Sequence, residues 1–299
     1  MADDADTPTE EYPWQFRAWV VREVEKMGLD ILDWRDGGLD ATDAKGEKRF
    51  IGLANLFRRV CSSPSEVSEQ IVRNFFESAQ VDTQGESPLL PDSIDDAAEQ
   101  LRIRIGKPFT DDDKAPWSMT LPGLDELALN LVVDYPTMMA FVTKPMMEAS
   151  SAGPEHWLER GLDNVRKAAP ENWLQLMHEK EGLWLGHVED SYDAARALAI
   201  CELTGSDELG WLIAIPARDW LFARKVDREG LQFFHFLKIF AERAYGEQPY
   251  PISDQVYWVR PGNRWMRFPI QVEDNQVTVS PPPEFAEALG LEAEELGAD

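Results

Sequence analysis

The stretch Gly186-His-Val-Glu-Asp-Ser-Tyr-Asp-Ala-Ala-Arg196, with Ile215-Pro-Ala-Arg-Asp219 further along the chain, decides the fold. Its first part predicts the end of a strand and then a helix from about Ser191 to Leu203, capped by Asp190 or Ser191. The apolar residues Trp211–Ile215 predict a buried strand, and the polar residues after it predict an exit at the surface. Ionisable side chains therefore stand where two strands end, a common place for functional groups.

Outward from this stretch, the chain repeats an order of two strands followed by a helix. Apolar runs bounded by turn residues predict the strands, and apolar residues at three- and four-residue steps predict the helices. The predicted strand pairs are Leu127–Asp134 with Met139–Thr143, Trp173–His178 with Leu183–Val188, and Trp211–Ile215 with Trp220–Val226; the helices include Pro154–Ala168 and Glu229–Tyr245. These units predict an α+β fold with a mostly antiparallel sheet and helices on one face.

The rest of the chain predicts further segments. Residues 1–11 are acidic and short of apolar groups, so we expect them to be disordered. Helices at Trp14–Met27, Phe50–Val60 and Ser93–Ile105, with a short strand at Leu29–Trp34, predict a mainly helical N-terminal part. The predicted segments are 1–11; a helical part, 12–106; a linker rich in proline and aspartate, 107–123; the α+β sheet domain, 124–250; and 251–299, with a β-hairpin, a proline-rich segment and an acidic helix and tail.

Four motifs stand out along the chain: Gly52–Phe57 (Gly-Leu-Ala-Asn-Leu-Phe), Asp134–Thr137 (Asp-Tyr-Pro-Thr), Asp190–Arg196 and Ile215–Asp219. They resemble motifs of a bacterial family of unknown function, the YtpQ-like proteins. The resemblance covers residues 15–250 in order and spacing, and it departs at the C-terminal hairpin and tail. It implies a bacterial cytosolic protein and brings no activity, ligand or catalytic residue with it.

The chain is strongly acidic, with a formal net charge of −26 over 299 residues. Residues 1–11 hold five acids and no base, and residues 284–299 hold six acids and no base, yet the remaining 44 acids still exceed the 29 bases. Such a charge repels nucleic-acid phosphates and anionic membranes, so we expect neither as a partner. It is typical of a solvated acidic surface, and it would also attract a basic protein partner.

Other features of the sequence predict a cytoplasmic protein. The N-terminus lacks the basic and apolar regions of a signal peptide, and no apolar run approaches the length of a membrane helix. Cys61 and Cys201 follow no metal-binding spacing and are typical of reduced thiols in the cytosol. With no glycine-rich phosphate loop and no Gly-x-Ser-x-Gly motif, we expect no cofactor and no covalent catalysis.

A crowding of His178, His187 and nearby carboxylates raises the question of a metal site. If His178 pairs opposite Leu183 in the predicted hairpin, the two histidines lie about 13 Å apart, too far to share one ion. A site that uses His187, Asp190 and Asp193 remains as an alternative. The simpler interpretation is that Asp190 caps the helix and Asp193 stabilises its first turn.

The polar cluster of Asp190, Tyr192, Asp193, Arg196, Arg218 and Asp219 has two interpretations. Arginine presents a planar fork that matches a carboxylate, so Arg218 and Asp219 could pair with the start of the helix and join the two connections as a structural network. The alternative is a ligand pocket that contains Tyr192, Arg196, Arg218 and Asp219.

The predicted C-terminal hairpin holds the one basic group of residues in the acidic chain. It combines two tryptophans with three arginines, residue types that are enriched in interface hot spots: Trp258, Arg260, Arg264, Trp265 and Arg267. The group is a candidate interaction surface for an acidic partner or for the acidic tail. Tryptophans packed on the edge of the sheet are the alternative.

Two classes of function follow from these observations. The first is a non-catalytic protein of the bacterial cytosol that binds a protein partner, basic in character, through its acidic surface, in a regulatory or immunity-type role. The alternative is a hydrolase, metal-dependent or not, with a pocket at Asp190–Arg196 and Arg218–Asp219. The absence of a recognisable catalytic spacing favours the first class, and the sequence leaves the oligomeric state open.

Overall fold

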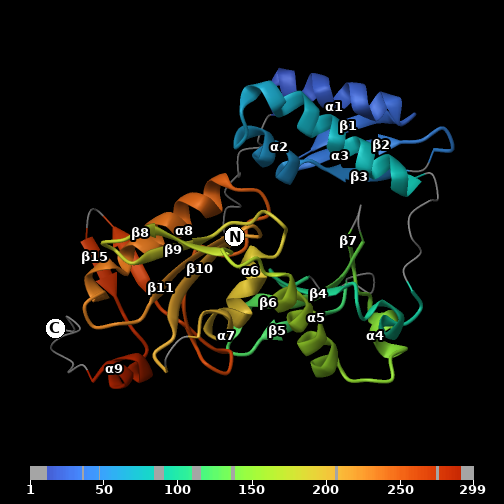
Figure 1. Ribbon diagram of the computed structural model, residues 1–299. Coiled ribbons are helices and arrows are strands. Elements are labelled where there is room, and N and C mark those ends of the chain that lie inside the picture. Colours follow the sequence, from blue (N-terminus) through green and yellow to red (C-terminus); the bar gives the residue numbers. More distant parts are fainter. Residues whose placement is uncertain are drawn as a thin grey trace, which may run out of the picture. The chain divides into compact units, whose positions relative to one another are not determined.

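The structure, a computed structural model, describes residues 12–35, 37–46, 48–83, 91–109, 116–135, 139–205, 208–273 and 276–290. The predicted disorder of residues 1–11 and the acidic tail after Gly290 lie outside these residues. The chain forms two compact units, Met1–Leu89 with Glu247–Pro249, and Leu90–Gly246 with Tyr250–Asp299 (Figure 1). Within them the α+β class and the mostly antiparallel pairing are confirmed.

The described residues of the first unit form a small sheet and three α-helices. Its elements are α1 (Trp14–Lys26), β1 (Asp30–Arg35), β2 (Gly38–Thr42), β3 (Lys48–Gly52), α2 (Ala54–Cys61) and α3 (Ser68–Thr83). The antiparallel sheet has the order β1-β2-β3. Of these strands, the sequence predicted only the first. Residues 50–52, which we expected to begin a helix, belong to β3, and α2 begins after them.

Four strands of the second unit form its first sheet. They are β4 (Leu101–Gly106), β5 (Ser118–Leu121), β6 (Leu124–Asp134) and β7 (Met139–Phe141), and β6 pairs with the other three. The helices α4 (Lys144–Glu148) and α5 (Pro154–Ala168) follow. The contact of α5 with this sheet includes a close approach to β4 at Gly161.

Two expectations for this region are wrong. The helix predicted at Ser93–Ile105 is a short 3₁₀ turn, η2 (Ile94–Ala97), followed by β4, in which Leu101, Ile103 and Ile105 are buried in strict alternation. That alternation is the two-residue period of a strand. In the segment for which we predicted a linker, Ser118–Leu121 form β5, which hydrogen-bonds to β6, while 110–115 are outside the described residues.

The second sheet has six strands in the antiparallel order β13-β12-β10-β11-β9-β8. They are β8 (Leu174–His178), β9 (Leu183–Gly186), β10 (Trp211–Ala217), β11 (Trp220–Lys225), β12 (Val256–Arg260) and β13 (Arg264–Arg267). The predicted hairpins β8–β9 and β10–β11 are confirmed. The helix predicted at Ser191–Leu203 is interrupted, as α6 (Asp193–Arg196), the 3₁₀ turn η3 (Ala197–Ala199) and α7 (Ile200–Thr204).

Both faces of the six-stranded sheet are buried, rather than one face alone. In β10, Leu212 and Ala214 belong to one apolar cluster and Ile213 and Ile215 to the other. The first cluster contains residues of α8 (His235–Glu247), α9 (Pro283–Leu289) and the hairpin β14–β15 (Ile270–Glu273 and Gln276–Val279). The second contains α5, α6, η3, α7 and the four-stranded sheet. The central strands are therefore apolar on both sides, which explains their continuous hydrophobic sequence.

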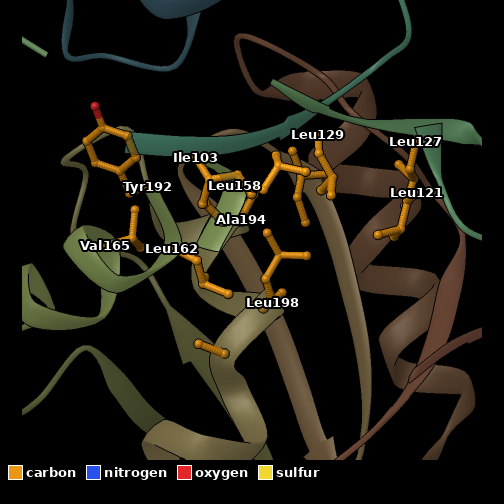
Figure 2. Close-up of a cluster of buried hydrophobic side chains, with 14 of the residues drawn as sticks. Ile103, Leu121, Leu127, Leu129, Leu158, Leu162, Val165, Tyr192, Ala194 and Leu198 are labelled. Carbon is orange, nitrogen blue, oxygen red and sulfur yellow. The ribbon is translucent and has the colours of Figure 1, made fainter. Parts of the chain in front are cut away.

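The apolar cluster shared by the two sheets is the largest that the described residues form. Side chains of β4, β5, β6, α5, α6 and η3 converge in it (Figure 2). Every residue from Tyr192 to Cys201 is buried, and four of them are alanines that allow close packing. None of the helices formed by the described residues has the length and apolar character needed to span a membrane.

The close packing of α5 predicts that two glycine-to-alanine substitutions change the free energy of unfolding in opposite directions. A Cβ added at Gly161 would lie 2.9 Å from Leu131 Cδ2 and 3.1 Å from the backbone nitrogen of Ile103, whereas one at Gly246, in α8, would meet no atom within 4 Å. We expect Gly161→Ala to lower the free energy of unfolding by about 1–3 kcal/mol. Gly246→Ala should raise it by up to about 1 kcal/mol, the helix propensity gain. Urea unfolding followed by tryptophan fluorescence measures both, and equal effects at the two sites would contradict this packing.

Candidate functional site

The predicted polar cluster is centred on an ion pair that is fully buried. The side chains of Asp193 and Arg196 are both 0% exposed, and Arg196 Nη1 donates to Asp193 Oδ1 at 3.0 Å. The same guanidinium grips the half-buried Asp190, through Nη1 to Oδ1 at 2.9 Å and through Nη2 to Oδ2. One cation therefore serves two carboxylates at the start of α6.

Asp193 also holds the turn that leads into the helix. Its carboxylate accepts hydrogen bonds from the backbone N–H of Val188, at 3.0 and 2.9 Å, and of Glu189, at 2.9 Å. In this turn Glu189 and Ser191 have φ values of 64° and 75°, a left-handed conformation that costs non-glycine residues about 1–3 kcal/mol each. The carboxylate of Asp193 thus fixes a strained connection.

The expected helix cap is wrong. The N-cap residue of α6 is Tyr192, and its side chain makes no capping hydrogen bond. Asp190 Oδ1 instead accepts from the N–H of Tyr192 at 3.1 Å, before the helix begins. Burial raises the pKa of Asp193, and the N–H donors and Arg196 oppose that rise. The side chain of Asp193 is therefore buried in the interior and does not face solvent at the first turn of the helix.

The backbone, rather than the expected arginine–carboxylate pairs, joins this turn to the β10–β11 connection. Ala194 N–H donates to the carbonyl oxygen of Arg218 at 3.1 Å. His187 Nδ1 lies 2.7 Å from the carbonyl oxygen of Asp219. Arg218 pairs with its neighbour Asp219, through Nη2 to Oδ2 at 2.8 Å, and its guanidinium lies 3.9 Å from the ring centroid of Tyr250.

A residue that we did not predict, Arg104 of β4, belongs to the same cluster. Burial lowers the pKa of its guanidinium, and the nearby charge of Arg218 lowers it further. Burial raises the pKa of Tyr192, and the negative charge of Asp134 adds to that rise. The alternation of Leu101 to Gly106 could have identified Arg104, because Arg102 and Arg104 share the strand face opposite the buried leucine and isoleucines.

The cluster offers little to a substrate. Within the described part of the chain, the hydroxyl of Tyr192 and Oδ1 of Asp219 have no hydrogen-bond partner, but both atoms are buried. Asp190 and Asp193, which a hydrolytic site would need, are taken up by Arg196 and by backbone N–H groups. The arrangement is that of a structural joint.

The donors for a metal ion do not converge. His178 lies opposite Leu183, as we assumed, and stacks on Phe240, with the ring centroids 6.3 Å apart. His187 packs on Trp220 with the ring centroids 4.2 Å apart. Among the described residues, no three histidine, cysteine, aspartate or glutamate side chains form a group that could hold a metal ion.

The tryptophans of the C-terminal hairpin are not exposed. Trp258 is 0% exposed and donates from Nε1 to the carbonyl oxygen of Leu209 at 2.7 Å, and Trp265 is also buried. Arg264 and Arg267 are three residues apart on one strand, so they point to opposite faces of the sheet. Arg260 lies opposite Arg264, and Arg267 pairs with Glu126 at 2.6 Å. These residues do not form the single basic patch that we expected.

The exposed carboxylates of α5 and its neighbours are the feature that the sequence did not single out. We call the following group the α5 acidic face: Asp95, Asp96, Glu99, Glu155, Glu159, Asp163 and Glu202. The polar links between α5 and the η2 segment include Arg160 with Glu99, and the side chain of Asn164, which donates to the carbonyl oxygens of Ala98 and Leu101 at 2.9 and 2.8 Å. The basic residues of the α5 acidic face are Arg160, Arg166 and Lys167, and its seven carboxylates outnumber them.

Comparison with known proteins adds no relative, because no family model, no curated protein and no solved structure matches the chain. The resemblance to the YtpQ-like family stays an expectation from the sequence.

The buried pair predicts unequal costs for two arginine substitutions. Arg196→Leu leaves Asp193 as a buried charge without a cation, so we expect a loss of about 3–5 kcal/mol in the free energy of unfolding. Arg218→Ala removes a partly exposed pair and should lower the melting temperature by an amount equivalent to only about 1 kcal/mol. Adding Asp193→Asn to Arg196→Leu should recover part of the loss. Thermal and urea unfolding test this order, and an Arg218→Ala variant that is the less stable of the two would reverse it.

Asp95, in the α5 acidic face, should remain ionised in unusually acidic solution. The hydroxyls of Ser93 and Ser151 lie 2.7 and 2.8 Å from its carboxylate oxygens, and the serine hydrogen bonds, led by Ser93, lower its pKa to about 2. The lowered pKa means that the associated stability is present above the ordinary pKa of 3.8 and is lost as the pH falls through about 2.

Carbon-13 NMR titration of the Asp95 carboxyl should therefore show a midpoint near 2, and Ser93→Ala with Ser151→Ala should move it toward 3.8. Ser280→Ala, in another part of the second unit, is the control and should leave the midpoint unchanged. A midpoint near 3.8 in the unsubstituted protein would refute these hydrogen bonds.

Proposed function

We propose that the chain is a non-catalytic protein that binds a basic partner protein through its acidic surface. The observation that carries the proposal is the division of its carboxylates. Those at the centre of the second unit are engaged by Arg196 and backbone N–H groups, whereas those of the α5 acidic face are largely exposed. Of these two groups, the exposed one is the group that can meet another molecule.

The pairing of charges leaves an excess on this face. Arg166 is shared by Glu159, Asp163 and Glu202, at 2.7, 2.7 and 2.5 Å. One guanidinium therefore offsets one of three carboxylates. Arg160 offsets Glu99, and the described residues include no ion pair for Glu155. A surface with such an excess attracts a positively charged protein and accelerates its encounter.

A regulatory or immunity-type role in the bacterial cytosol fits this chemistry. An acidic protein that covers a basic surface blocks the access of that surface to phosphates. The bacterial and cytosolic parts of the proposal rest on the family resemblance and on the sequence features described above. The hydrolase alternative receives less support, because the carboxylates it requires are occupied by Arg196.

The proposal predicts binding that weakens with salt. The protein would be used to capture proteins from a lysate of its native host at about 50 mM and about 500 mM salt, a range over which the screening length falls from about 14 Å to about 4 Å. We expect the bound protein to be basic and its amount to fall roughly tenfold or more at the higher concentration. Capture that does not change with salt would refute binding led by charge.

A matched pair of variants locates the surface. Asp96→Asn, Glu99→Gln and Glu202→Gln neutralise three exposed acids of the α5 acidic face, and Glu171→Gln, Glu179→Gln and Glu229→Gln neutralise three exposed acids elsewhere. Both variants have the same net charge. The first should lose more binding than the second if the α5 acidic face meets the partner.

A further inference from the structure

A cavity of about 310 Å³, lined by both aliphatic and polar residues, opens beside the α5 acidic face. Its floor consists of aliphatic side chains from four elements, which Figure 2 shows gathered together: Ile103, Leu129, Leu158, Leu162 and Leu198. The volume lies at the lower end of the range for sites that hold small ligands or single anchoring side chains. Every lining residue belongs to the second unit.

Two carboxylates stand at the rim of this cavity. Glu155 and Glu159 are one helical turn apart on α5, so their side chains lie on the same side of the helix. Both residues are exposed. Glu159 shares Arg166 with two other acids, and the described residues place no ion pair on Glu155. The rim is therefore negative while the floor is apolar.

The basic residues nearby neutralise the rim only in part, because Arg166, which pairs with Glu159, is shared with Asp163 and Glu202. Lys167 is three turns beyond Glu155 on α5, about 18 Å along the helix axis. Across the cavity, the β12–β13 turn contributes Gly262 and Asn263, which carry no charge. Asn263 is held in place, since its Oδ1 accepts from Trp265 Nε1 at 2.6 Å.

We propose that this cavity is the docking point for a basic segment of the partner protein, with one large apolar side chain in the cavity and an adjacent lysine or arginine on Glu155 and Glu159. The proposal rests on the proposed function and names the place of contact. Anchors of interfaces are apolar or aromatic side chains seated in pockets and surrounded by polar contacts. A second copy of the chain is a poor occupant, because each copy has a net charge of −26.

A short peptide provides a direct test. The probe has lysine at each end and leucine and phenylalanine between them; one analogue has glycines in place of the apolar pair, and another has serines in place of the lysines. NMR spectra of leucine methyl groups would be recorded during titration. We expect the probe to shift the methyls of Leu158, Leu162 and Leu198 and to bind roughly tenfold more tightly than either analogue.

Charge reversal at the rim tests the role of the two glutamates, and the same reversal elsewhere on the surface is the matched control. Glu155→Lys alone should weaken binding of the probe severalfold, and Glu155→Lys with Glu159→Lys should weaken it by roughly tenfold. Glu171→Lys with Glu179→Lys, which makes the same change of charge away from the cavity, should leave binding unchanged. Because Glu159 pairs with Arg166, the melting temperature of each variant is measured first. The single variant, which breaks no ion pair among the described residues, keeps the test valid if the double variant unfolds.

Two results would overturn this docking site. The first is a probe that leaves the three leucine methyls unshifted, and the second is equal weakening by the control reversal. Either result can occur while capture of the partner still falls with salt, in which case the acidic-surface function stands and this site is wrong. Capture that is insensitive to salt, by contrast, removes the proposed function whatever the peptide does.

Discussion

The buried ion pair between Asp193 and Arg196 is the constraint on which the second unit depends. Removing two charges from water costs several kcal/mol for each, and hydrogen bonds to the remaining lone pairs and donors offset that cost. Here the N–H groups of Val188 and Glu189 and the carboxylate of Asp190 supply most of these bonds, and Nε of Arg196 is buried without a partner. The pair therefore forms only if the chain leaves β9 through this one strained turn, and so it selects the path of the chain at the point where the two sheets meet.

The position of α6 extends this local constraint to the whole unit. The helix contacts β4 of one sheet and β11 of the other (Figure 1), and Ala194 is tied to the β10–β11 connection through the carbonyl oxygen of Arg218. The alanines that follow, from Ala194 to Ala199, let both sheets approach the chain closely. A cluster of this kind resembles an active site in sequence, because it gathers acids and arginines at strand ends. In the structure the carboxylates of Asp190 and Asp193 are occupied by Arg196 and by backbone N–H groups, and the atoms of the cluster that lack a partner are buried.

The sequence predicted the features that depend on local pattern. The apolar run of β10, the hairpins around β9 and β11 and the whole of α5 follow from periodicity and turn residues alone. It failed where a neighbour decides the outcome. The sequence suggests that Trp258 is exposed, because Pro261 and Gly262 predict a turn beside it. In the structure Phe285 of α9, a helix much later in the chain, packs against Trp258 with the ring centroids 5.0 Å apart. We expected Asp193 to stabilise the first turn of a helix capped by Asp190 or Ser191, and only the fold shows that the N–H groups of Val188 and Glu189 donate to its carboxylate. Arg104 lies on the polar side of the alternating strand β4, and we missed it because we predicted a helix for that segment.

The exposed acidic residues of the chain are not needed to stabilise its fold. The α5 helix buries Leu158 and Leu162 and exposes Glu155 and Glu159, so the stability of the helix comes from its apolar side. Substitutions of exposed residues such as these two glutamates usually change the free energy of unfolding by less than about 0.5 kcal/mol. Solubility of a small domain needs a net charge of only about 2–8 in magnitude, and a larger charge destabilises the compact state through self-repulsion. A chain at −26 lies well above that range and therefore bears a self-repulsion that its folding does not require. Contact with a positively charged surface would relieve that repulsion, so in the proposed complex the excess charge would contribute more to stability than it does in the free protein.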